Sequence, residues 1–274
     1  MKKIFCMFIL FMLIGCAAKT HPNVNSVLWV RTAAEYEASG FQAYNAAANI
    51  IDTAIRDTRW TAALEQTGHF SDLPPAVIFD IDETVLDTSA YQAGLVSNDT
   101  DFQHKTWDQW IAKQTAESIA GAKDFIRFLQ SRGVAVIFIT NRECAGRPDS
   151  MSACPQKGDT LETLKALGIT DIDENHVLLK NAFPDWGSEK QGRREFVAEK
   201  YRVLMLFGDD LGDFIPDVKK NIPPEKREEL ALQFSDKWGT RWFILPNPMY
   251  GSWQRVLQAP GAEYLKPKKS TQFR

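Results

Sequence analysis

The sequence predicts an α/β protein with a doubly wound parallel sheet and a smaller, mainly α-helical cap. Three observations predict it: apolar runs of strand length recur along the chain, helical patterns separate them, and residues 89–118 interrupt this rhythm. Strands that alternate with helices indicate a parallel sheet with helices on both faces. Ligands of such sheets bind outside the carboxyl ends of the strands, so the residues after each apolar run are the first place to expect a site.

The apolar runs are continuous, as is typical of strands that are buried on both faces. They cover residues 76–79, 134–139, 177–179, 203–207 and 242–245, the last of which stops at Pro246. Helical patterns cover residues 119–129, 160–167 and 193–201. Upstream, apolar residues recur at helical spacing from Tyr36 to Ile55, and a further helical stretch is expected to end at Pro74 and Pro75.

Four regions follow from these patterns. Residues 1–20 are a leader with the start of a tether, which we expect to continue to residue 25, and residues 21–70 form an N-terminal helical region. Residues 71–88 and 119–274 form the core with a C-terminal extension. Residues 89–118, which contain Trp107 and Trp110, are expected to be a helical cap inserted over the crevice.

The leader has the features of a secretory signal peptide. Lys2 and Lys3 precede an apolar run from Ile4 to Ile14, which is too short to span a bilayer comfortably. The following Cys16 completes a Leu-Ile-Gly-Cys string that resembles the lipobox of bacterial lipoproteins, although an ordinary signal peptide with an incidental cysteine is the alternative. The resemblance implies anchoring to the membrane through lipidated Cys16, at an outer membrane, facing the periplasm or the cell surface.

Removal of the leader leaves Cys144 and Cys154 as the thiols of the exported chain. Two nearby cysteines in an exported loop favour a disulfide. Two thiolates alone are too few ligands for structural zinc, which makes a metal site the weaker interpretation.

Charge excludes one class of partner. The net charge of −3 and the pI near 5.9 provide no basic surface for a nucleic acid polymer. These quantities leave open whether the chain forms a homodimer.

Asp80 and Asp82 follow the first apolar run and carry the strongest local signal. An aspartate can act as a nucleophile toward phosphorus, and Mg²⁺ binds carboxylate oxygens together with phosphate oxygens. An EF-hand is excluded because Val85 and Tyr91 stand where that loop needs glycine and glutamate. A purely structural acidic turn remains the alternative for the pair alone.

Further polar strings follow the later apolar runs. The residues are Thr140-Asn141-Arg142, Ser188-Glu189-Lys190, and Gly208-Asp209-Asp210-Leu211-Gly212-Asp213. The hydroxyl and backbone N–H groups of the first string are groups that hold phosphate oxygens.

Together with Asp80-Ile81-Asp82-Glu83-Thr84, these three strings resemble the four motifs of the haloacid dehalogenase (HAD) superfamily, which implies a HAD-like Rossmannoid core. The chain is most similar to the class C acid phosphatases, the bacterial outer-membrane lipoprotein acid phosphatases and 5′-nucleotidases. Supporting strings are Gln42-Ala43-Tyr44-Asn45, Thr84-Val85-Leu86-Asp87, Trp107-Asp108-Gln109-Trp110 and Leu245-Pro246-Asn247-Pro248-Met249-Tyr250-Gly251-Ser252-Trp253. The chain departs from the family at Asp210, where asparagine is frequent, and at Thr140, where serine is frequent.

The resemblance implies a metal-dependent phosphoric monoester hydrolase that works through an aspartyl-phosphate. Asp80 is the expected nucleophile, and Asp82 is the expected acid and base, which favours turnover below neutral pH. Thr140 and Lys190 complete the phosphate site. Lys180 is the rival for the lysine role.

The expected cofactor is Mg²⁺, bound by the Asp80 carboxylate, the Asp82 backbone carbonyl and Asp209. Asp213 is either a direct ligand or lies just outside the ligand sphere. The departure at Asp210 leaves open which acidic residue of this motif contacts the metal.

The expected substrates are small phosphomonoesters, above all nucleoside monophosphates. Asn141 and Arg142 are expected to contact the substrate, while Trp107 and Tyr250 are candidates to stack on a nucleobase, although cap packing would also explain these aromatic residues. Two other functions remain open: a phosphotransferase, which the same residues permit, and a lipid-anchored protein that binds nucleotide or haem.

Overall fold

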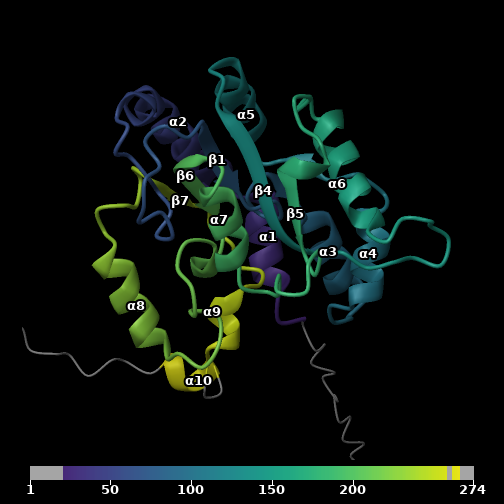
Figure 1. Cartoon of the computed structure of the whole chain (residues 1–274). Coiled ribbons are helices and arrows are strands. Elements are labelled where there is room, and N and C mark those ends of the chain that lie inside the picture. The colour runs from purple at the N-terminus through teal and green to yellow at the C-terminus, as the bar shows by residue number, and fades with distance from the viewer. Residues whose placement is uncertain (1–20, 258–260, 266–274) are drawn as a thin grey trace, which may run out of the picture.

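A parallel sheet forms the centre of the computed structural model, which describes residues 21–257 and 261–265 (Figure 1). The strand order is β5-β4-β1-β6-β7. The strands are β1 (Pro75–Phe79), β4 (Ala135–Glu143), β5 (Val177–Lys180), β6 (Arg202–Gly208) and β7 (Trp242–Ile244). The predicted α/β class is therefore confirmed, and the expected signal peptide with Cys16 lies outside the described residues.

The position of β1 explains where a ligand can bind. This strand pairs with β4 on one side and with β6 on the other, both in parallel. The chain continues from β1 to β4 and β5, and then returns across β1 to β6 and β7. The strand order thus reverses beside β1, and its carboxyl end opens into the crevice that such a reversal creates.

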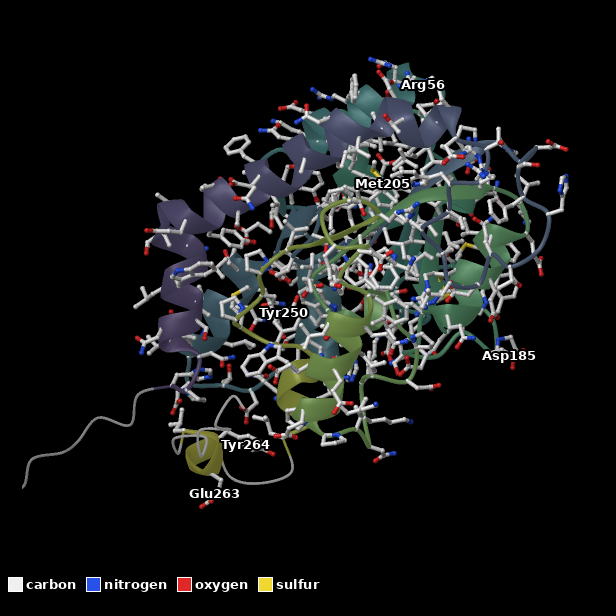
Figure 2. The ribbon with its side chains drawn as sticks, turned by 90° about the vertical axis from the view of Figure 1, so that its left-hand side faces the viewer. Arg56, Asp185, Met205, Tyr250, Glu263 and Tyr264 are labelled. Atoms are coloured by element: carbon white, nitrogen blue, oxygen red, sulfur yellow. A yellow bond between two sulfur atoms is a disulfide. The ribbon has the colours of Figure 1, made fainter. Side chains whose placement is uncertain are left out.

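Helices cover both faces of the sheet. One face packs against α2 (Ala34–Arg56), α5 (Ala122–Ser131) and α6 (Pro155–Ala166), and the other packs against α7 (Gln191–Ala198) and the segment after β6. In Figure 2, Arg56 marks the end of α2 at the upper edge of the molecule, while Met205 of β6 lies inside it. None of the helices in residues 21–257 and 261–265 has the length and apolar character needed to span a membrane.

Aromatic rings fill the core directly behind the carboxyl end of β1. Phe207 stacks on Phe79 with ring centroids 4.7 Å apart, and on Phe243 at 4.8 Å. Tyr44 of α2 stacks on Phe207 at 5.1 Å and donates a 2.6 Å hydrogen bond to the Thr84 carbonyl. The rings therefore tie the helix to the turn that carries Asp80 and Asp82.

The segment that we expect to form the cap, residues 89–118, is largely helical. Its helices α3 (Ser89–Ser97) and α4 (His104–Ile111) lie between two short antiparallel strands, β2 (Leu86–Asp87) and β3 (Glu117–Ser118). Tyr91 of α3 packs edge-on against Trp107 of α4, with ring centroids 5.0 Å apart. Figure 1 shows both helices near one end of the sheet, with α4 beside α6.

The structure differs from the sequence prediction at three places. Residues 24–25 belong to helix α1 (Val24–Thr32), which packs on α3, and are not part of a tether. Residues 57–73 form turns and no helix, because Trp60 and Gln66 bind backbone carbonyls at Leu204 and Tyr201. Strand β4 continues past residue 139 to Glu143, since its polar end still pairs with β5.

The remaining helices lie toward the C-terminal end of the described residues. Helix α8 (Pro224–Gln233) connects β6 to β7, while α9 (Ser252–Arg255) and α10 (Gly261–Tyr264) follow β7. Two short 3₁₀ turns are η1 (Glu174–His176), before β5, and η2 (Leu211–Asp213), after β6. The loop between β7 and α9 carries Asn247 and Tyr250 back to the crevice.

Candidate active site

Three carboxylates meet at the end of the sheet. Asp80 follows β1, Asp209 follows β6, and Asp213 ends the turn η2. One oxygen from each lies within 4.8 Å of the others. Asp80 and Asp213 are buried, with 7% and 6% of their surface exposed, so water screens their mutual repulsion poorly.

Lys190 supplies the compensating charge. Its ammonium lies 2.6 Å from a carboxylate oxygen of Asp213 and also contacts Asp80. The rival Lys180 instead forms an ion pair with Glu143, at 2.5 Å. The structure therefore brings Lys190, and not Lys180, to Asp80.

The negative charge of this centre is only partly compensated, which favours a bound cation. Burial raises the pKa of Asp80 to about 7; Lys190 opposes this rise, while Asp213 and Asp82 add to it. Burial, Asp80 and Asp213 raise the pKa of Asp209 well above its ordinary value. Carboxylates that are crowded and short of positive charge fit Mg²⁺, whose ligands are oxygen atoms.

The local sequence explains why Asp209 and Asp213 point to one place. Gly208 lies so close to the Asp213 side chain that a Cβ atom would collide with it. Asp210 turns away, because its carboxylate accepts hydrogen bonds from Gly212 N–H at 2.8 Å and from Ser252 N–H at 2.6 Å. Although burial acts to raise the pKa of Asp210, these N–H groups lower it. Asp210 thus stabilises the turn, while Asp209 and Asp213 face Asp80.

Asn247 orients the second carboxylate of the centre. Its amide nitrogen donates a 2.7 Å hydrogen bond to Asp209. The amide is carried by the loop after β7, far from Asp209 in the sequence, so strand-end motifs alone did not reveal it.

Asp82 faces the cap side of the crevice. Arg142 donates hydrogen bonds to both of its carboxylate oxygens, at 2.7 and 3.1 Å, and a third to Thr160 at 3.0 Å. The Arg142 guanidinium also lies 5.9 Å from the centroid of the Trp107 ring. Arg142, which we expected to contact substrate, is thus engaged by Asp82 in this structure, and Trp107 lies beside that pair.

Thr140 and Asn141 are held by a buried arginine. Arg193 is fully buried and donates to the Thr140 carbonyl at 2.5 Å and to the Asn141 side chain at 2.8 Å. The Asn141 amide donates in turn to the Ser188 carbonyl at 3.1 Å, which Lys219 also contacts at 2.7 Å. These bonds connect the end of β4 to the loop that carries Lys190.

Glu83 is a buried acid that the sequence did not single out. It has a left-handed backbone (φ 58°), and its carboxylate accepts hydrogen bonds from Thr88 Oγ1 at 2.6 Å and from the Tyr250 hydroxyl. Burial raises the pKa of Glu83 to about 8, and the charge of Asp82 adds to this effect. Its place directly after Asp82 was a signal, but its partners become visible only in the fold.

The carboxylate centre opens into a cavity of about 770 Å³. Every residue that the sequence predicts for the site lines it: Asp80, Asp82, Trp107, Thr140, Asn141, Arg142, Lys190, Asp209, Asp213 and Tyr250. Lys219 and Glu143, which the sequence did not single out, line it as well. Figure 2 shows Tyr250 near the middle of the molecule, well below Arg56 at the upper edge.

Similar proteins have this architecture. The chain is 30% identical to the class C acid phosphatase from Bacillus anthracis, whose structure it matches with a TM-score of 0.71 over 89% of this chain and 93% of that one. The structure of the Bacillus anthracis enzyme with tungstate bound matches with a TM-score of 0.72, at 30% identity over 89% and 94% of the two chains.

Sequence comparison gives a consistent result. The chain is 25% identical over 194 residues to the stem 31 kDa glycoprotein of Glycine max, a match that spans 69% of this chain and 63% of that protein, less than two thirds of its length. The family model of the HAD superfamily, subfamily IIIB (acid phosphatase), matches residues 15–253. The chain therefore belongs to the HAD superfamily, subfamily IIIB, the acid phosphatases.

Proposed function

We propose that the chain is a metal-dependent phosphatase that hydrolyses small phosphomonoesters, with nucleoside monophosphates as its substrates. One observation carries the proposal: Asp80 lies at the reversal of the strand order, in contact with the Lys190 ammonium and beside the carboxylates of Asp209 and Asp213. This arrangement combines a nucleophile with an ammonium that attracts phosphate oxygens and with carboxylates that could hold a metal ion. A protein that only binds a ligand has no use for a nucleophile beside phosphorus.

The reaction has two steps. A carboxylate oxygen of Asp80 attacks phosphorus, the bond between phosphorus and the ester oxygen breaks, and Asp82 gives its proton to the leaving oxygen. Asp82 then removes a proton from water, which attacks the phosphorus of the aspartyl-phosphate. The bond between phosphorus and Asp80 breaks, phosphate leaves, and both carboxylates return to their starting states.

Arg142 orients Asp82. It donates hydrogen bonds to both oxygens of the Asp82 carboxylate and so holds this group at the wall of the cavity.

The residues that would hold Mg²⁺ are Asp80, Asp209 and Asp213, together with the backbone carbonyl of Asp82. When bound, the cation neutralises the repulsion between the carboxylates and the phosphate dianion. Asn247 orients Asp209 for this role, and Lys190 remains between Asp80 and Asp213 to meet phosphate oxygens.

The tungstate complex of the Bacillus anthracis enzyme supports a phosphate site. Tungstate is a tetrahedral oxyanion like phosphate, and the two chains share their fold over 89% of this chain. For this chain, the groups available to such an anion are Lys190, the hydroxyl of Thr140 and the backbone N–H groups near Asp80.

The cavity supports a nucleotide as substrate. A volume of about 770 Å³ falls in the range typical of sites for small molecules, and it exceeds what a phosphate group alone requires. Tyr250 and Trp107 line it, and aromatic rings that stack on a base contribute about 1–3 kcal/mol per base. Trp107 is stacked on Trp110, with ring centroids 5.2 Å apart, so packing within the cap already holds the Trp107 ring at the wall of the cavity.

We also propose that the chain is exported and anchored to the outer membrane through lipidated Cys16. The disulfide between Cys144 and Cys154 supports export, because disulfides persist in oxidising compartments. Labelling of cells with a radioactive fatty acid tests the anchor: wild-type protein should carry label, and Cys16→Ser should not. Label that persists in Cys16→Ser would contradict it.

The test of the catalytic proposal measures phosphate release from nucleoside monophosphates, with and without chelator. Asp80→Asn should lower the rate by on the order of 10³-fold or more, as removal of a nucleophile does. The control is Asp72→Asn, because Asp72 is a highly exposed aspartate whose side chain is 85% accessible. Activity that survives both the chelator and Asp80→Asn would reject the proposal, whereas transfer of phosphate to an added alcohol would identify a phosphotransferase.

A further inference from the structure

A disulfide-closed loop forms part of the rim of the cavity. Cys144 and Cys154 are bonded and enclose residues 145–153, between β4 and α6. Ala145 and Gly146 of this loop line the cavity. The next residue, Arg147, has no part in the proposed chemistry.

Arg147 joins the cap to the core. Its guanidinium donates two hydrogen bonds to the carboxylate of Asp108 in α4, at 2.7 and 2.8 Å. Another nitrogen of the same group donates to Asp159 in α6, at 2.6 Å. The Arg147 side chain is only 15% exposed, and a planar fork with several donors can satisfy two carboxylates at once.

Two glutamines complete the contact. Gln156 donates to Asp108 at 2.8 Å and accepts from Ala145 N–H at 3.1 Å, so it links the cap to the disulfide loop. Gln114, just after α4, donates to Asp159 at 3.1 Å. Another ion pair between α4 and the core, His104 with Glu143, is more open, with the His104 side chain 70% exposed.

The contact lies next to the aromatic wall. Asp108 directly follows Trp107, whose ring lies 5.9 Å from the Arg142 guanidinium that holds Asp82. A shift of α4 away from the core therefore moves Trp107 relative to the acid and to the leaving group of the substrate.

We infer that Arg147 is a positioning residue: it holds α4 on the core and thereby places Trp107 over the cavity. The disulfide supports this role by closing the loop that carries Arg147. The inference about the position of α4 stands on these contacts alone, while its consequence for substrates rests on the proposed phosphatase function. Loss of Arg147 should weaken the binding of nucleoside monophosphates and leave the chemical step largely intact.

Hydrogen exchange followed by mass spectrometry tests the position of α4 without any need for activity. Arg147→Gln removes the bridge, and backbone amides of residues 104–111 should exchange at least about tenfold faster, because local opening becomes easier. The control is Arg132→Gln, which removes a more exposed ion pair with Asp52, whose side chains are 41% and 47% accessible. Unchanged exchange of α4 in Arg147→Gln would overturn the inference.

Kinetics test the consequence for the substrate. In Arg147→Gln, KM for a nucleoside monophosphate should rise about tenfold, and kcat should stay within about threefold, because α4 does not touch phosphorus. KM for glycerol phosphate, which has no ring to stack, should stay unchanged. An equal rise of KM for both substrates, or a loss in kcat alone, would overturn the positioning of Trp107.

Two further variants protect the test. Asp108→Asn keeps the shape of the side chain and weakens the same bridge, so it should reproduce the exchange and KM effects. This variant serves as the test if Arg147→Gln folds poorly. Arg147→Lys should not restore the wild type, because one ammonium cannot form the bidentate contact with Asp108 and also reach Asp159. If the wild type hydrolyses no phosphomonoester, the proposed function fails, and the exchange experiment still decides whether Arg147 holds α4.

Discussion

The carboxylate centre and the cap contact at Arg147 are both built from charged side chains, yet they are held in different ways. Asp80, Lys190 and Asp213 are almost fully buried and follow strands or turns of the central sheet. Asp108 and Arg147 keep 30% and 15% of their side chains exposed and join two surface elements. The difference teaches that the sheet places the buried charges of the carboxylate centre, whereas the cap contact depends on side chains that join two surface elements.

Removal of Lys190 should have the largest effect on stability. Lys190→Met leaves the buried Asp80 and Asp213 without their partner, and loss of one member of a buried ion pair costs about 3–5 kcal/mol. Lys180→Met is the matched control, because its partner Glu143 is 31% exposed and such pairs contribute less than about 1 kcal/mol. Urea unfolding in the presence of chelator measures the loss of stability in both variants. Equal losses would contradict the distinction between the buried carboxylate centre and the more exposed ion pairs around it.

Magnesium should stabilise the fold through the carboxylate centre and have no effect through the cap contact at Arg147. At a concentration of about 100 times its Kd, Mg²⁺ should raise the free energy of unfolding by about 2.7 kcal/mol. Asp209→Asn should abolish this gain. Asp210→Asn should retain it, because Asp210 binds Ser252 and Gly212 N–H groups instead. A gain that disappears in Asp210→Asn and persists in Asp209→Asn would show that the ligands are assigned wrongly.

Tyr250 should affect substrate binding, because its ring lines the cavity. Tyr250→Ala should raise KM for a nucleoside monophosphate by about tenfold, the equivalent of about 1–3 kcal/mol of stacking, and change glycerol phosphate hydrolysis less. Tyr250→Phe separates the ring from the hydroxyl that donates to Glu83. If both substrates lose equally in Tyr250→Ala, the ring supports the site and does not contact a base.

The smallest expected effect is the pH dependence of the cap contact. The hydrogen bonds from Arg147 lower the pKa of Asp108 below its ordinary 3.8, although burial opposes them. A lowered pKa in the folded state means that the stabilisation is present above 3.8 and is lost as the pH falls through the lowered value.

Denaturant unfolding at several pH values measures this dependence. The difference in free energy of unfolding between wild type and Arg147→Gln should be constant from neutral pH down to about pH 4, amount to about 1 kcal/mol, and shrink below that. A difference that grows with acid would have the wrong sign for a contact made by the ionised Asp108.

The two regions also differ in how far the sequence predicts them. The centre was predictable, because Asp80, Lys190 and Asp209 follow apolar runs whose carboxyl ends must meet in a parallel sheet. The order of the strands around β1 then places these residues in one cavity.

The rim was not predictable from such patterns. Arg147 and Asp108 lie on two surface segments that are far apart in the sequence. No local sequence pattern around either residue predicts that the two form an ion pair. Glu83 and Tyr250 are 167 positions apart and meet only because the loop after β7 folds back across the crevice. The end of β4 was also missed, because its polar residues stay in the strand by pairing with β5.

The most direct test of the central claim is to trap the covalent intermediate. Wild-type protein mixed with substrate and quenched in acid should carry one phosphoryl group, which peptide mass spectrometry locates on Asp80. Asp80→Asn should carry none. A phosphoryl group on another residue, or rapid turnover without any labelled residue, would contradict the account.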